Sequence, residues 1–108
     1  MSEKHNLEFV HDIGQEDAQG LIEAHKSYGD SWKKRGGVSA FMMLCRKWDR
    51  LENQCEKHGY NIFEAIAADP RAEGVIDDVR DLRRYLTLVE AELRAQGVEA
   101  ASSKHRDN

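Results

Sequence analysis

The sequence has little of what marks membrane, secreted or disulfide-bonded proteins. No apolar run approaches the roughly 20 residues that a membrane span needs, and Met1–Asn6 lacks the apolar core of a signal peptide. Two of the 108 residues are cysteine, and one is proline. These scarcities predict a cytoplasmic protein with no membrane span, and the single proline favours long helices.

The two cysteines are predicted to remain reduced. Cys45 and Cys55 lie ten residues apart on one expected helix, which separates them by about 15 Å along its axis. A disulfide requires Cα atoms within roughly 7 Å of each other. We therefore expect free thiols packed against apolar neighbours, as in a reducing compartment.

The composition also narrows the function classes. The formal net charge is −4, so general binding to nucleic acid is not expected. The chain has no glycine-rich phosphate loop of the Walker or Rossmann type and no serine in a nucleophile elbow. Its five histidines show no metal-ligand spacing with the cysteines. Hydrophobic residues at 40% and charged residues at 33% are typical of a helix-rich globular domain.

Hydrophobic periodicity predicts an all-α, bundle-like domain of three long or medium helices and one short helix. We expect a loosely structured N-terminal arm over residues 1–14, the folded domain over 15–97 and a disordered tail over 98–108. The helices are expected at residues 15–27, 39–58, 61–68 and 71–96. Ser39 is a candidate N-cap, Asn61–Glu64 resembles a capping box, and Gly59 and Gly97 follow helix ends.

Two apolar stripes are long for so small a domain. The stripe of the second helix contains Phe41, Leu44, Trp48, Leu51 and Cys55. The stripe of the last helix contains Val75, Val79, Leu82, Leu86, Val89 and Leu93. Because the stripes on three amphipathic helices exceed what one short bundle easily covers, we expect a homodimer that buries the remaining apolar edges.

Paired acids beside these stripes are the main candidate site. Asp49 and Glu52 lie three residues apart, as do Asp78 and Asp81, and such residues share a helix face. Two packed helices would aim four carboxylates at one point, which suits a hard cation such as Mg²⁺. The alternative is a set of local ion pairs with neighbouring arginines, since a carboxylate near a buried seam needs a partner.

The segment from Tyr28 to Gly37 combines aromatic and basic residues with three glycines. One interpretation is a solvated basic loop, with Tyr28 and Trp32 against the core. The other is a lid or phosphate clamp, in which the aromatic rings stack on a base and the cations meet phosphate oxygens.

The order of these motifs resembles a known superfamily. Acid-x-x-acid, about 25 residues, then acid-x-x-Asp is similar to the signature of the all-α nucleoside triphosphate pyrophosphohydrolases, the MazG-like superfamily. Lys26-Ser-Tyr28-Gly29, Arg46-Lys47-x-x-Arg50 and Asp78-x-x-Asp81-x-x-x-Tyr85 resemble the phage-associated nucleotide modification domain 1 family. The likeness covers about residues 16–95.

The resemblance implies a Mg²⁺-dependent hydrolase that converts a nucleoside triphosphate to its monophosphate and pyrophosphate. The catalytic metal ligands would be Asp49, Glu52, Asp78 and Asp81, and the residues that bind the nucleotide would be Lys26, Tyr28, Trp32, Lys33, Lys34 and Arg46. Three of the four ligand positions hold Asp where Glu prevails in the superfamily, and Arg50 follows Asp49 where a second Glu is common. These departures keep an alternative open: a non-enzymatic helical protein, such as a phage-encoded inhibitor of host defence, that binds a host protein partner or sequesters a nucleotide.

Overall fold

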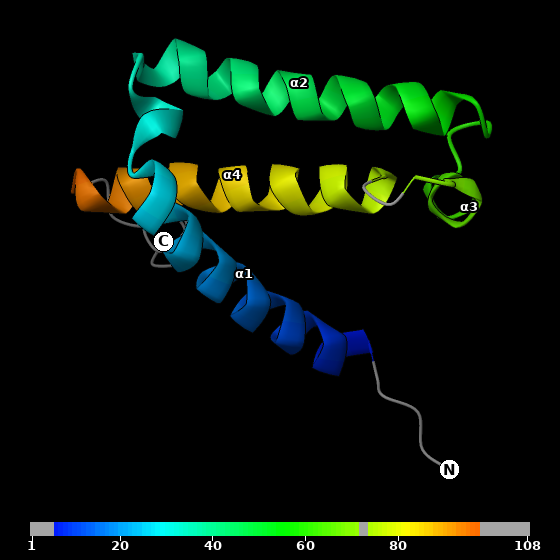
Figure 1. Ribbon diagram of the computed structural model, residues 1–108, viewed down its shortest axis with the longest axis horizontal. Helices are drawn as coiled ribbons and strands as arrows, with labels where there is room; N and C mark the ends of the chain where they lie inside the picture. The colour runs from blue at the N-terminus through cyan, green and yellow to red at the C-terminus, as the bar shows by residue number, and fades with distance from the viewer. Residues whose placement is uncertain (1–5, 72–73, 98–108) are drawn as a thin grey trace, which may run out of the picture.

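The computed structural model describes residues 6–71 and 74–97, which form an all-α fold and confirm the predicted fold class. The elements are α1 (Asn6–Tyr28), the short 3₁₀ helix η1 (Ser31–Lys33), α2 (Gly36–Glu56), α3 (Ile62–Ala68) and α4 (Val75–Ala95). Helices α2 and α4 lie side by side and run in opposite directions, with α3 at one end of the pair and α1 crossing at an angle (Figure 1). Within the described ranges, no helix is long and apolar enough to cross a membrane.

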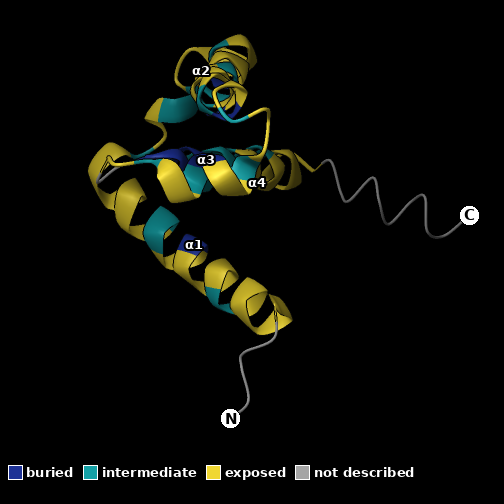
Figure 2. Ribbon diagram, turned by 90° about the vertical axis from the view of Figure 1, so that its right-hand side faces the viewer, coloured by how far each residue is buried: buried dark blue, intermediate teal, exposed yellow. Residues whose placement is uncertain are grey.

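The hydrophobic core is small and lies where α2, α3 and α4 meet. Its buried members are Leu51, Cys55, Ala65 and Val75. Partly buried apolar side chains of α3 and α4 pack around them. Figure 2 shows how few residues are fully buried and that most of α1 is exposed. A core of this size provides only a modest apolar contribution to stability.

The predicted short helix is confirmed at its N-terminus. The side chain of Asn61 accepts hydrogen bonds from the backbone N–H groups of Phe63 and Glu64, at 3.1 and 3.2 Å. It thereby satisfies two donors that have no partner inside the helix. Gly97 follows the end of α4 with a φ of 84°, in the left-handed region that glycine adopts without steric cost.

The first helix is longer than the sequence predicted. It begins at Asn6, so the expectation of a loosely structured arm is wrong for residues 6–14. Gly14 lies inside the helix, and its cost of about 1 kcal/mol relative to alanine does not interrupt it. The remainder of the expected arm, residues 1–5, and the expected tail, residues 98–108, lie outside the described residues.

The last helix begins later than predicted, at Val75 rather than Arg71. The reason is a loop organised by Asp69, whose carboxylate accepts hydrogen bonds from the backbone N–H groups of Arg71 at 3.0 Å and Val75 at 2.7 Å. A Cβ on Gly74 would collide with this carboxylate, so the close approach requires glycine. The side chain of Arg71 and these backbone donors hold the pKa of Asp69 well below its usual range.

Ion pairs connect α1 to α4. Asp17, buried on α1, accepts hydrogen bonds from Arg83, including one from Nη2 at 2.8 Å, and from Arg84 Nε at 2.8 Å. Gly20 lies one turn further along α1, where a Cβ would meet the guanidinium of Arg84 at 2.6 Å. The absence of a side chain at Gly20 therefore leaves room for the guanidinium of Arg84.

We predict that this connection makes stability depend on pH in the acid range. Hydrogen bonds from Arg83, opposed by burial and aided by Arg84, lower the pKa of Asp17 from 3.8 to about 2. Because the folded-state pKa is depressed, the stabilisation is fully present above pH 3.8 and is lost as the pH falls toward 2. Replacement of Asp17 by Asn should cost about 1 kcal/mol at neutral pH and less at acid pH.

Urea unfolding followed by circular dichroism, at neutral pH and at about pH 3, measures this effect. Glu16→Gln is the matched control, because the exposed neighbouring side chain accepts none of these bonds through its carboxylate. An equal difference between wild type and Asp17→Asn at both pH values would contradict the assignment.

Candidate functional site

The two acids of α4 face two cations of α2. Asp81 pairs with Lys47, with Oδ2 and Nζ 2.8 Å apart, and Asp78 pairs with Arg50, with Oδ1 and Nε 3.3 Å apart. Both the acids and the cations are spaced three residues apart, so the two pairs lie one helical turn from each other. The contact is a short ladder of opposite charges between antiparallel helices.

Asp78 is the most deeply placed charge of this ladder. Its side chain is 1% exposed, whereas that of Arg50 reaches solvent. The second carboxylate oxygen, Oδ2, is buried and has no hydrogen-bond partner within residues 6–71 and 74–97. A buried carboxylate with an unsatisfied oxygen depends strongly on nearby cations, which here are Arg50 in the ion pair and, at longer range, Arg71.

The acids of α2 do not join those of α4. Asp49 and Glu52 are exposed, and no group of three or more His, Cys, Asp or Glu side chains in the described part of the chain is placed to hold a metal ion. Lys47 lies four residues before buried Leu51 and so shares its inward face, whereas Asp49 projects away. The expected convergence of four carboxylates is therefore not observed, and the arrangement is an ion-paired one.

We predict that Arg50 is structural and that Asp49 is not. Arg50→Ala would leave the buried carboxylate of Asp78 without its partner and should cost about 3 kcal/mol of unfolding free energy. Asp49→Ala should change stability by no more than about 0.5 kcal/mol, because the side chain is exposed. Urea titration of both variants measures the difference, and equal losses would contradict this account of the ladder.

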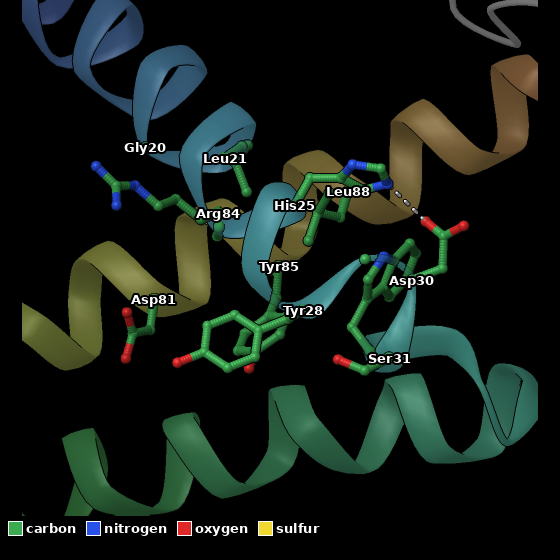
Figure 3. Close-up of a pocket in the computed structure, with 13 residues that line it drawn as sticks. Gly20, Leu21, His25, Tyr28, Asp30, Ser31, Asp81, Arg84, Tyr85 and Leu88 are labelled. Carbon is green, nitrogen blue, oxygen red and sulfur yellow. Dashed lines mark ion pairs between the residues drawn. The ribbon is translucent and has the colours of Figure 1, made fainter.

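A cavity of about 420 Å³ lies beside the ladder, between the C-terminal end of α1, η1 and α4. Its lining is mainly apolar and aromatic, with Asp81 and Arg84 contributed by α4 (Figure 3). The residues that form its apolar and aromatic walls are Leu21, Ala24, Tyr28, Trp32, Tyr85 and Leu88. Its volume is in the range of small-molecule sites in proteins.

A second, more open hollow adjoins the first. Both are lined by Tyr28, Asp30 and Ser31, and the second adds Lys33 and Lys34. Lys33 Nζ donates a hydrogen bond to Glu92 at 2.6 Å, and this carboxylate raises the pKa of the lysine. The basic loop predicted as a clamp thus lies directly beside the aromatic cavity.

The structure separates the predicted site residues into three groups. Tyr28 and Trp32 line the aromatic cavity together with Asp81, and Lys33 and Lys34 line the adjoining hollow. Lys26 pairs with Glu23 on the outside of α1 and, like Arg46, lines neither space in the described chain. The remaining predicted acids, Asp49, Glu52 and Asp78, line neither space either.

A histidine, an aspartate and an arginine of the cavity lining were not predicted as site residues. His25 and Asp30 form an ion pair at the cavity, with Nε2 and Oδ1 3.6 Å apart (Figure 3). Arg84 reaches the same space from α4. The spacing could have indicated Arg84, because it lies three residues after Asp81 and shares its helix face. The sequence does not show, however, that α1 lies over that face.

Comparisons with known proteins found no relative of this chain. No protein-family model matches the chain, no curated protein matches its sequence, and no solved structure matches its fold. The resemblance to the all-α nucleoside triphosphate pyrophosphohydrolases stays a prediction from short motifs.

Proposed function

We propose that the protein binds a nucleotide in the cavity between α1, η1 and α4. The observation that carries the proposal is the pairing of an aromatic cavity of about 420 Å³ with a lysine-lined hollow at its edge. A nucleotide has the same two parts, a flat apolar base and a charged phosphate chain. One ligand can therefore use both spaces at once.

The base belongs in the aromatic cavity. Tyr28, Trp32 and Tyr85 provide ring faces from three different elements, and Leu21 and Leu88 add apolar wall. Stacking of a base on an aromatic side chain contributes about 1–3 kcal/mol and tolerates any base. Polar contacts from His25, Asp30 or Ser31 at the same cavity would then distinguish one base or sugar from another.

The phosphates belong in the adjoining hollow. Lys33 and Lys34 follow Tyr28 by five and six residues and line this space with it. Ammonium groups bind phosphate oxygens through charge-assisted hydrogen bonds, which are about twice as strong as neutral ones. Lys33 would exchange its partner Glu92 for the ligand, which couples binding to a local rearrangement of η1.

Hydrolysis of a nucleoside triphosphate with Mg²⁺ is the further part of this proposal. Proteins commonly hold Mg²⁺ through one or two carboxylates together with the substrate's own phosphates. Asp81 is the predicted acid that lines the aromatic cavity, so it would hold the ion if the phosphate chain of the nucleotide reached from the hollow into that cavity. The ion would neutralise charge on the phosphates, while Lys47 holds Asp81 in position.

A cytoplasmic location also belongs to the proposal. Cys45 and Cys55 are both free thiols, which agrees with a reducing compartment where nucleoside triphosphates are present.

Nucleotide binding is expected to change the fluorescence of Trp32. The chain contains two tryptophans, and Trp48 lines neither space, so a Trp48→Phe variant would report on the cavity alone. In that background, titration with ATP, GTP and their deoxy forms should change the emission. Tyr28→Ala should weaken the affinity about tenfold through lost stacking. Tyr60→Ala, which alters an exposed tyrosine elsewhere, is the control. No signal and no heat of binding with any nucleotide would overturn the proposal.

Hydrolysis is tested separately from binding. Pyrophosphate release from a nucleoside triphosphate should require Mg²⁺ and should fall at least a hundredfold in Asp81→Asn, because the carboxylate that would hold the ion is lost. Asp49→Asn should keep full activity, since its exposed side chain lies outside the cavity. Binding without release would identify a nucleotide-sequestering protein instead of an enzyme.

A second candidate function is the binding of a protein partner, either a host protein or a second copy in the predicted homodimer. The observation that favours it is the number of large apolar side chains left exposed, with Phe63 at 82% among them. Patches of this kind commonly mark interaction surfaces. A partner-binding protein would retain its partner in Asp81→Ala, and co-purification of that variant from its native host extract discriminates this function from catalysis.

A further inference from the structure

One of the two lysines that line the hollow is already bound to a carboxylate. Lys33 Nζ on η1 donates a hydrogen bond to Glu92 Oε1 on α4 at 2.6 Å, although 59 residues separate the two in sequence. The other carboxylate oxygen, Oε2, accepts a hydrogen bond from Gln96 Nε2 at 2.8 Å. The Lys33 and Glu92 side chains are only 34% and 27% exposed. Both oxygens of Glu92 therefore have a donor, which favours one position of this side chain beside the lysine.

Glu92 belongs to the face of α4 that forms the cavity wall. Asp81, Tyr85 and Leu88 line the cavity, and Glu92 follows Leu88 by four residues and Tyr85 by seven. Residues at these intervals share one helix face. The face that begins at the cavity with Asp81 thus ends with a carboxylate at Lys33. Glu92 itself lines neither space, so Lys33 directs its ammonium group at a residue outside both of them.

The second lysine of the hollow differs from the first. Lys34 is exposed and forms no ion pair in the described part of the chain. Glu92 raises the pKa of Lys33, and hydrogen bonds from Lys33 and Gln96 lower the pKa of Glu92, so both partners are charged at neutral pH. The hollow therefore presents one unpaired ammonium group and one that an internal anion holds.

We propose that Glu92 competes with the phosphate chain of the ligand for Lys33. This inference rests on the proposed nucleotide site and assigns a residue that regulates it. Carboxylate and phosphate oxygens accept the same charge-assisted hydrogen bonds from an ammonium group, and two anions beside one lysine repel each other. A nucleotide therefore displaces Glu92 before it gains the full contact with Lys33.

The competition weakens the hold on the phosphates and leaves the hold on the base unchanged. The walls of the aromatic cavity do not include Lys33, so a nucleoside binds without displacing Glu92. When the ligand loses phosphates, as in the proposed hydrolysis, Glu92 pairs with Lys33 again and the product loses that contact. Gln96, on the same helix, keeps the carboxylate near for this return. The contact thus favours release of the product.

A charge-removing substitution tests the competition. Glu92→Gln keeps an oxygen that can accept a hydrogen bond from Lys33 but removes the negative charge. ATP and GTP should bind this variant about fivefold more tightly than the wild type, whereas adenosine and guanosine should bind both proteins equally. The emission of Trp32 in the Trp48→Phe background measures all four affinities. Glu90→Gln, the same change at an exposed acid of α4, is the matched control and should alter none of them.

A double-mutant cycle assigns the effect to the lysine. In a Lys33→Met background, Glu92→Gln should no longer tighten the binding of ATP. A gain that persists there would reveal general repulsion and would overturn the competition. Weaker binding of nucleosides and nucleotides alike in Glu92→Gln would show that Glu92 holds η1 in place, and would also overturn it. Equal binding of ATP by the wild type and Glu92→Gln would refute the competition alone. No binding of any of the four compounds to any variant would refute the proposed function and this inference with it.

The resting contact is tested without a nucleotide. During acetylation by acetic anhydride, Lys33 should react more slowly than Lys34, because its ammonium group is paired and its pKa is raised. Glu92→Gln should accelerate the reaction of Lys33 about threefold and leave that of Lys34 unchanged. Mass spectrometry of the digested protein measures both rates. Equal rates for Lys33 in the wild type and in Glu92→Gln would overturn the inference even if nucleotides bind.

Discussion

The burial of Asp78 against Arg50 is the constraint on which the arrangement of α2 and α4 depends. A carboxylate that is 1% exposed stays charged at low cost only if a cation is held beside it, and one residue of α2 supplies that cation. One turn away, Asp81 on α4 forms a second ion pair with Lys47 on α2. Any slip of one helix along the other would break both pairs. The ladder therefore fixes the register, whereas the few buried apolar side chains provide less directional attraction.

Charge also positions the elements outside this pair. Asp17 ties α1 to Arg83 and Arg84, and Lys33 ties η1 to Glu92 near the end of α4. These contacts join segments that are more than 50 residues apart in the chain. The cavity lies between these segments, so the ionic contacts that hold α1 and η1 beside α4 also position its walls.

The sequence was sufficient to predict the helices and the capping residue Asn61, but not to predict which helix faces contact each other. The all-α class and the Asn61 cap follow from periodicity and capping chemistry, which act within a few residues. The candidate site could not be predicted in the same way. The cations Lys47 and Arg50 have the same three-residue spacing as the acids Asp49 and Glu52, so spacing does not distinguish the two pairs. Only the contact with α4 decides which of these pairs faces inward. The early start of α1 differs from the prediction because Gly14, at a cost of about 1 kcal/mol relative to alanine, does not interrupt the helix.

The origin of the cavity walls has a consequence for how the protein folds. One wall comes from residues 20–32 and the other from residues 81–88, so the space forms only after the intervening α2 and α3 have brought α4 back alongside α1. Closing so long a loop carries an entropic cost before any contact repays it. We expect the cavity to assemble late in folding and to open early in unfolding. A ligand that occupies it would slow the loss of native structure by holding together two ends of the chain that otherwise separate first.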